Sequence, residues 1–324
     1  MNKKEWKWFK KNSTKHIWKN AQANWIKELF PTPFMDFLSH FKHGEKFYNN
    51  MQALRFLIKR KAAMPNLEYI VTTRCTLNCK HCNTFIPYFN NQTHANLTPF
   101  ETFKQDIDKL LKSVDYIYDF GFVGGEPLLS KDLPKMIEYA VSKKQLKHIF
   151  IATNCTILPS PELIKAMKHK KVAVQISDYR RVKNIKGNVK VQYDEFKKIL
   201  IDNGINFNNY QEKRDAATWA TMPELYIDNR DPKIVEKMYD ACYGRYCTML
   251  CEGLITQCTL AVYVSRCMEL TQGVKEELVN IRELDTKELT QRMIKYYARP
   301  FSQFCHYCHI ENRKINLPCG EQME

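Results

Sequence analysis

The stretch Thr73-Arg74-Cys75-Thr76-Leu77-Asn78-Cys79-Lys80-His81-Cys82 carries three cysteines at C-x3-C-x2-C spacing. It follows a short apolar run, residues 69–72, that is typical of a buried strand. Thiolates at short, fixed spacing hold zinc or iron–sulfur centres, and a metal that does chemistry keeps one coordination position open. With no fourth cysteine or well-spaced histidine nearby in the sequence, the spacing predicts a cubane with one open iron. Part of a structural zinc site is the alternative.

A second motif, Gly124-Gly125-Glu126-Pro127, ends the apolar run 116–123. Glycines let a backbone approach a ligand closely, and a carboxylate pairs with an ammonium group, although the four residues alone also fit an ordinary turn. Together the two motifs resemble the radical S-adenosylmethionine (SAM) superfamily. The resemblance implies that a [4Fe–4S] cluster is held by Cys75, Cys79 and Cys82, and that its open iron chelates the methionine part of SAM. It further implies that the second motif holds the α-amino group of SAM, and that His81 also belongs to the cofactor site.

Strand-like and helix-like segments alternate through the middle of the chain. Apolar runs rich in β-branched and aromatic residues lie at 68–73, 116–123, 148–153, 172–177 and 205–210. Helices are expected from Thr98-Pro99 and from Ser160-Pro161, because a capping residue followed by proline commonly begins a helix. Another helix is expected over 132–142, where Leu133, Ile137 and Ala140 fall on one face. This alternation predicts an α/β fold with a parallel sheet. In length and resemblance it fits a partial (β/α)6 TIM-type barrel, whose site lies at the C-terminal strand ends.

Two further strand ends carry candidate SAM-binding residues. Asn154 follows the third strand, where relatives usually read Thr-Asn-Gly, but here Cys155 replaces the glycine. Cysteine adopts positive φ poorly. Cys155 is therefore interpreted either as a small buried hydrophobic residue or as a catalytic thiol facing the substrate. Ser177 and Asp178 end the fourth strand and are assigned either to the ribose hydroxyls of SAM or to capping of the next loop.

The last hundred residues are rich in cysteine, which in a reducing cytosol favours metal binding over disulfides. The eight cysteines are Cys242, Cys247, Cys251, Cys258, Cys267, Cys305, Cys308 and Cys319. Their spacing resembles the Twitch form of the SPASM extension, which carries one auxiliary [4Fe–4S] cluster. The resemblance implies the ligands Cys242, Cys258, Cys305 and Cys308, with Cys247 or Cys251 as substitutes for Cys242 and structural zinc as the alternative. Residues 253–258 are expected to form a hairpin turn and strand, continued by 261–264.

Residues 1–65 are basic and rich in tryptophan. They hold 14 basic against 4 acidic residues, a net +10 of the chain's +15, and four of its five tryptophans. We expect a helical extension that packs on the barrel. An interfacial helix within residues 1–30 on an anionic membrane is a second interpretation. Nucleic-acid binding is the weakest, because no base-reading motif is present.

These observations predict three parts: the extension (1–65), a radical SAM core (66–229) and an auxiliary-cluster domain (230–324). The resemblance implies an enzyme that cleaves SAM to a 5′-deoxyadenosyl radical, which abstracts hydrogen from its substrate. A cytoplasmic location is expected, because the N-terminal residues lack the 7–15 residue apolar core of a secretory signal. A carbohydrate or small polar substrate, dehydrogenated or epimerised, is favoured over a ribosomally made peptide. Cys155, Cys247 or Cys319 would return hydrogen in epimerisation, and flavodoxin or ferredoxin would supply electrons. A zinc-stapled basic binding module is the competing, non-enzymatic interpretation.

Overall fold

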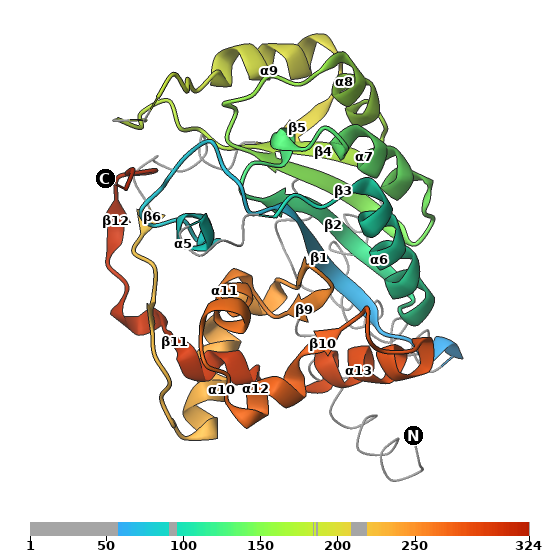
Figure 1. The fold of residues 1–324 in the computed structure, drawn as a ribbon, viewed down its shortest axis with the longest axis vertical. Coiled ribbons are helices and arrows are strands. Elements are labelled where there is room, and N and C mark those ends of the chain that lie inside the picture. Colours follow the sequence, from blue (N-terminus) through green and yellow to red (C-terminus); the bar gives the residue numbers. More distant parts are fainter. Residues whose placement is uncertain (1–57, 91–95, 184, 186, 209–218, 324) are drawn as a thin grey trace, which may run out of the picture.

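An eight-stranded, mostly parallel sheet organises the computed structural model, which describes residues 58–90, 96–183, 185, 187–208 and 219–323 (Figure 1). The strand order is β10-β9-β8-β1-β2-β3-β4-β5. The five strands that come first along the chain pair in parallel, each with the next. They are β1 (Ala63–Thr72), β2 (Tyr116–Gly124), β3 (Leu146–Thr153), β4 (Val172–Ile176) and β5 (Asn206–Asn208).

Four helices follow these strands and cover one face of the sheet (Figure 1). They are α6 (Phe100–Ser113), α7 (Leu133–Ser142), α8 (Pro161–Met167) and α9 (Tyr193–Asp202). The short helix α5 (Ile86–Asn90) lies on the opposite face, where Ile86 and Phe89 belong to a second hydrophobic cluster. The main hydrophobic core lies between this helical layer and the sheet, with Phe103 of α6 against Phe120 and Phe122 of β2. The predicted α/β fold is confirmed.

The expected helix starts are close to the observed ones. Ser160 caps α8, and its hydroxyl accepts a hydrogen bond from the Leu163 amide at 3.2 Å. Pro99, expected at the first helical position after a Thr98 cap, takes the N-cap position of α6, so the helix begins one residue later than expected. The carboxylate of Asp132 accepts from the Phe100 amide at 3.1 Å, so a distant residue provides the bond expected from a local cap.

The C-terminal part of the chain continues the same sheet. Strand β8 (Met249–Cys251) pairs in parallel with β1 and forms a hairpin with β9 (Leu254–Thr256), which pairs with β10 (Val279–Asn280). With β8, six strands run in parallel, as the partial barrel predicts. The sheet crosses the expected boundary at residues 229 and 230, while the division into three parts itself stays a prediction.

One predicted element is wrong. The hairpin is present, but residues 261–264 do not continue it as a strand, because they lie within helix α11 (Thr259–Cys267). Leu260, Ala261 and Val264 are buried in the second hydrophobic cluster, which lies against Ile70, Val123 and Met249 of the sheet. This packing outweighs the strand preference of a short run that contains two valines.

The remaining elements are short helices and two-stranded ladders. The helices are α10 (Pro232–Ala241), α12 (Gln272–Glu277), α13 (Thr286–Ala298) and the 3-10 turns η1 (Pro127–Leu129), η2 (Tyr243–Tyr246), η3 (Gln303–Tyr307) and η4 (Ile310–Asn312). The ladders join β6 (Trp219–Ala220) to β12 (Ile315–Leu317) and β7 (Glu224–Leu225) to β11 (Cys308–His309). Among the described residues, no helix is long and apolar enough to cross a bilayer. Most of the basic extension, including 1–30, lies outside those residues.

Candidate SAM site and auxiliary cysteine cluster

The glycine motif lies directly against the cysteine loop. The Gly125 amide donates to the Thr72 carbonyl at 2.7 Å, and the Glu126 amide donates to the Arg74 carbonyl at 2.8 Å. A Cβ atom at Gly124, whose φ is +137°, would collide with the Thr72 carbonyl, and one at Gly125 would collide with that of Arg74. The two glycines therefore bring the end of β2 against the backbone that leads into Cys75. The sequence suggested that the glycines allow close approach to a ligand. In the structure they allow close approach to the protein backbone of Thr72 and Arg74.

Glu126 is fully buried, with 0% of its surface exposed. One carboxylate oxygen accepts from the Leu128 amide at 3.1 Å and the Thr153 hydroxyl at 2.9 Å; the other accepts from the Asn154 amide at 2.8 Å. Burial raises the pKa of Glu126 to about 7, and these hydrogen bonds oppose the rise. We expected this carboxylate to hold the amino group of SAM. That role stays a prediction; in the structure the carboxylate fixes the turn after β3, and Pro127 begins η1 beside it.

Asn154 connects the turn after β3 with the cysteine loop. Its side-chain amide donates to the Cys75 sulfur at 3.6 Å and to the Thr76 hydroxyl at 3.0 Å. Its carbonyl oxygen accepts from the Thr156 amide at 3.0 Å, which fixes the orientation of the side chain. Asn154 thus lies at the predicted cluster, where a donor to a ligand sulfur stabilises the thiolate. The contacts of Thr76 and Thr156 have no signal in the sequence.

The three loop cysteines lie close enough for their charges to interact. Burial, followed by smaller effects that include Cys82, raises the pKa values of Cys75 and Cys79 to about 12. None of the three forms a disulfide. Among the described residues, no three His, Cys, Asp or Glu side chains form a ready-made metal site. The donor set nevertheless fits an iron–sulfur cluster, because three neighbouring thiols on one loop are soft ligands that deprotonate when they bind metal. His81, beside them, is partly buried.

Cys155 does not fit the role of a thiol that faces a substrate. It has 0% exposed surface and belongs to the main core. Its φ is +59°, so it keeps the backbone conformation that relatives fill with glycine. Burial raises the pKa of its thiol further from neutrality. The interpretation as a small buried hydrophobic residue agrees with this position.

The polar residues after β4 serve mainly the local loop. The Ser177 amide donates to the Thr153 carbonyl at 3.0 Å, which ties β4 to β3. The carboxylate of Asp178 accepts from the Arg180 amide at 3.1 Å and from two nitrogens of its guanidinium at 2.9 and 2.7 Å. These bonds, with the Arg180 side chain first, lower the pKa of Asp178. The structure thus favours capping over ribose binding for this carboxylate.

Four C-terminal cysteines come together from distant parts of the chain. The thiol of Cys305 is influenced by the charges of Cys258, Cys308 and Cys242, after the larger effect of burial on its pKa. Burial also raises the pKa of Cys258 to about 11 and that of Cys308 to about 12. The group contains the four residues predicted to hold an auxiliary cluster, and their ligand role stays a prediction.

The structure also distinguishes the alternative ligands. The thiol of Cys247 is close to Cys258 and Cys242, whereas Cys251 is buried in the second hydrophobic cluster and interacts with Arg266 and Arg282. The Gly244 amide donates to the Cys242 sulfur at 3.3 Å. The geometry therefore favours Cys242, keeps Cys247 as a neighbour and places Cys251 apart.

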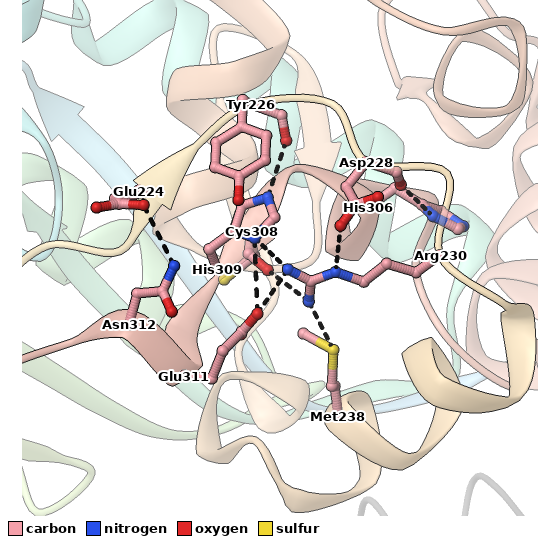
Figure 2. Close-up of polar contacts among 10 residues, drawn as sticks. All are labelled: Glu224, Tyr226, Asp228, Arg230, Met238, His306, Cys308, His309, Glu311 and Asn312. Carbon is pink, nitrogen blue, oxygen red and sulfur yellow. Dashed lines mark hydrogen bonds and ion pairs between the residues drawn. The ribbon is translucent and has the colours of Figure 1, made fainter.

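A network of polar residues borders this group (Figure 2). Arg230 donates to the carboxylates of Asp228 at 2.8 Å and Glu311 at 2.6 Å, and its guanidinium contacts His309 and the Cys308 carbonyl. The ring of His309 stacks on Tyr226, with 3.5 Å between the ring centroids. These contacts fix the short β11 strand that carries Cys308. The sequence showed no signal for them.

Cys319, which the sequence suggested as a catalytic thiol that returns hydrogen, lies at the first cysteine loop. Its charge influences Cys79, and residues 321–323 pair with residues 78–80. Cys79 and Gln322 form an antiparallel bridge. This pairing joins segments more than 240 positions apart, so neither spacing nor periodicity could predict it.

Comparison with known proteins identifies the core. The family described as the radical SAM superfamily matches residues 69–205, which contain the cysteine loop, the glycine motif and strands β2 to β4. Residues 69–205 belong to the radical SAM superfamily. This assignment brings with it SAM and an iron–sulfur cluster as cofactors of the family.

Individual similarities are partial. The chain is 34% identical over 117 residues to an uncharacterized protein of Methanocaldococcus jannaschii, covering 35% of this chain and 38% of that one. It is 33% identical over 110 residues to the 7,8-dihydro-6-hydroxymethylpterin dimethyltransferase of the same organism, covering 34% and 21%. The chain thus spans less than two fifths of these relatives. Among solved structures, anSMEcpe with bound AdoMet superposes with a TM-score of 0.46 at 14% identity, covering 81% of this chain and 91% of that one.

Proposed function

We propose that the protein is a radical SAM enzyme that uses SAM to abstract hydrogen from a carbohydrate or another small polar substrate, with dehydrogenation or epimerisation as the outcome. The observation that carries the proposal is the close packing of the C-x3-C-x2-C loop against the glycine motif at the C-terminal end of β2. In parallel barrels this end of the strands holds the site.

Each part of the mouth of the barrel has a defined task. Cys75, Cys79 and Cys82 would hold the cluster, while Asn154 hydrogen-bonds the Cys75 sulfur and links it to β3. When bound, the reduced cluster and SAM supply the electron and the 5′-deoxyadenosyl radical. Glu126 holds the turn that orients Asn154. With its carboxylate bound in this way, the backbone of residues 124–126 is left as the candidate partner of the SAM amino group.

The inner face of the sheet supports a polar substrate. Leu67 and Tyr69 of β1 point into the helix-side core, so the intervening Glu68 lies on the opposite face. The strand register puts further polar side chains on that face: Asn66, Asp119, His148, Gln175 and Asn208. Gln175 and Asn208, near the C-terminal ends of β4 and β5, offer hydrogen bonds to hydroxyl groups, whereas Asp119 and His148 already pair with each other.

We further propose that Cys242, Cys258, Cys305 and Cys308 hold one auxiliary [4Fe–4S] cluster, and that flavodoxin or ferredoxin supplies electrons. An auxiliary cluster is suited to accept an electron from a substrate radical, which yields net oxidation. Cys155 is buried, which removes one of the three candidate hydrogen donors for epimerisation. Dehydrogenation is therefore the outcome that we favour.

The first test removes a cluster ligand. In protein purified and reconstituted without oxygen, Cys75→Ala should abolish 5′-deoxyadenosine formation from SAM, because the loop would lose a third of its thiols. Cys267→Ala is the matched control, because Cys267 lies on α11, packs against the second hydrophobic cluster and belongs to neither predicted set of cluster ligands. Continued SAM cleavage by Cys75→Ala at the control rate would refute the proposed cluster. Colourless protein with tetrahedral zinc would favour the binding module instead.

The second test removes half of the C-terminal group. Replacing Cys305 and Cys308 with Ala together should lower the iron content from about eight to about four atoms per chain, since each cubane holds four. SAM cleavage should persist, because the first loop is unchanged. Iron content and absorbance near 400 nm measure the result. An unchanged iron content would remove the auxiliary cluster from the proposal.

A further inference from the structure

The last described residues form part of the wall around the cysteine loop. We call residues 319–323 the tail segment. The Lys80 amide donates to the Glu321 carbonyl at 2.7 Å, and the Met323 amide donates to the Asn78 carbonyl at 2.8 Å. Figure 1 shows the C-terminal end next to β6 and β12, on the same side of the molecule as α5. The segment therefore runs antiparallel to the loop that carries Cys79.

The side chain of Gln322 reaches the middle ligand. Its amide nitrogen donates to the Cys79 sulfur at 3.4 Å, and its carbonyl oxygen accepts from the Asn78 amide at 2.7 Å. Because a backbone N–H can bond only to the oxygen, the second contact defines the orientation of the amide group. The nitrogen must then face the sulfur and the Gly320 carbonyl, which lies 2.6 Å away.

The tail segment is held in place by more than this one side chain. Gly320 has a φ of +70°, and a Cβ atom there would lie 2.9 Å from the Tyr179 ring and would overlap Val182. The exposed Glu321 carboxylate pairs with Lys80 at 3.4 Å. Only glycine allows the chain to pass so close to the residues after β4, which puts Gln322 at a fixed position.

The other two ligand sulfurs receive their contacts from nearby or core residues. The Leu77 amide lies 3.4 Å from the Cys75 sulfur, which also accepts from Asn154, and the Thr84 hydroxyl lies 3.0 Å from the Cys82 sulfur. Cys79 differs, because its side-chain donor comes from the tail segment. A donor to a ligand sulfur stabilises the more negative, reduced form of a cluster and so raises its reduction potential.

We propose that the tail segment is a built-in part of the SAM-cluster site, in which Gln322 is a positioning residue that hydrogen-bonds the Cys79 ligand and raises the reduction potential of the cluster. The inference rests on the proposed function, since it needs a cluster on Cys75, Cys79 and Cys82. It assigns to the end of the chain a role in the electron transfer that starts the chemistry.

The test is a redox titration of the full chain, in which the EPR signal of the reduced SAM cluster is measured at each potential. To isolate that signal, the titration uses the Cys305→Ala/Cys308→Ala background. Gln322→Ala should shift the midpoint potential to a more negative value, because the sulfur loses its donor. Loss of iron to a chelator should become about 10-fold faster, as is typical when an outer partner of a metal ligand is removed. Gln272→Ala is the matched control, because it removes an exposed glutamine side chain that bonds Glu276 on α12, outside the tail segment, and it should leave both parameters unchanged.

A second variant separates a local effect from loss of structure. Gln322→Glu keeps an oxygen for the Asn78 amide but cannot donate to sulfur and adds a negative charge, so its potential should fall below that of Gln322→Ala. Unchanged potentials in both variants, with intact clusters, would overturn the proposal. If the Gln322→Ala variant takes up no iron, the midpoint potential of Gln322→Glu decides: a more negative value supports the proposal, and an unchanged value overturns it. Failure of the proposed function is distinct from either result, because it would appear as absent cluster signal in the background protein with Gln322 in place.

Discussion

At the scale of single residues, Cys155 shows how a departure from a family pattern is accommodated. A non-glycine residue in the left-handed region costs about 1–2 kcal/mol. Here the backbone keeps that conformation, and the side chain is buried among core residues that include Ile151 and Val174. Burial of the side chain offsets part of the strain. The pattern Thr-Asn-Cys alone could not distinguish this outcome from a reactive thiol.

Thiol labelling tests this account of Cys155. In the native protein an alkylating reagent should leave Cys155 unmodified, because the side chain is inaccessible and burial keeps the thiol protonated. The partly exposed Cys267 should react under the same conditions. Mass spectrometry of the digested protein measures both, and denaturant should make Cys155 reactive. Native labelling of Cys155 as fast as that of Cys267 would contradict its burial.

At the scale of elements, the contact between β2 and the cysteine loop depends on two adjacent glycines. The backbone of Gly125 lies against Arg74 so closely that no side chain fits between them. Any substitution must therefore separate the glycine motif from the loop, and the hydrogen bonds at Thr72 and Arg74 would lengthen. The geometry of the predicted SAM site depends on this contact.

Gly125→Ala tests the contact. We expect the variant to bind less iron after reconstitution and to unfold at a lower temperature, because the added methyl group collides with the Arg74 carbonyl. Gly204→Ala is the control: Gly204 has a φ of +64° and open space around it, so alanine there adds only backbone strain of about 1 kcal/mol. Iron content and melting temperature are measured for both. Equal iron content in the two variants would show that the contact does not shape the site.

The sequence predicted the elements of the barrel better than those of the C-terminal part. Strands β2, β3 and β4 and the start of α8 follow from apolar runs and a Ser-Pro cap, which are local signals. Residues 261–264 resemble a strand, but their environment in the second cluster makes them helical. Short segments with mixed signals are decided by tertiary packing, which the sequence does not display.

At the scale of the whole molecule, distant segments complete both candidate sites. Strand β8 joins the sheet beside β1, and the tail segment pairs with the cysteine loop. The cysteine loop and the glycine motif could be recognised in the sequence from their own residues. Their long-range partners Gln322 and Arg230 could not be predicted, because nothing local marks them. The position of Cys319 bears on the central claim, since a fourth thiol lies near the three that should leave one iron open.

The most direct measurement is electron–nuclear double resonance on the reduced cluster, with SAM labelled at its methionine amino and carboxyl groups. If three cysteines leave one iron open, the labelled nuclei should couple to the cluster, and the coupling should be the same in Cys319→Ala. If the wild-type protein shows no coupling and Cys319→Ala does, the thiol of Cys319 already occupies the fourth position, and the account of an open iron is wrong.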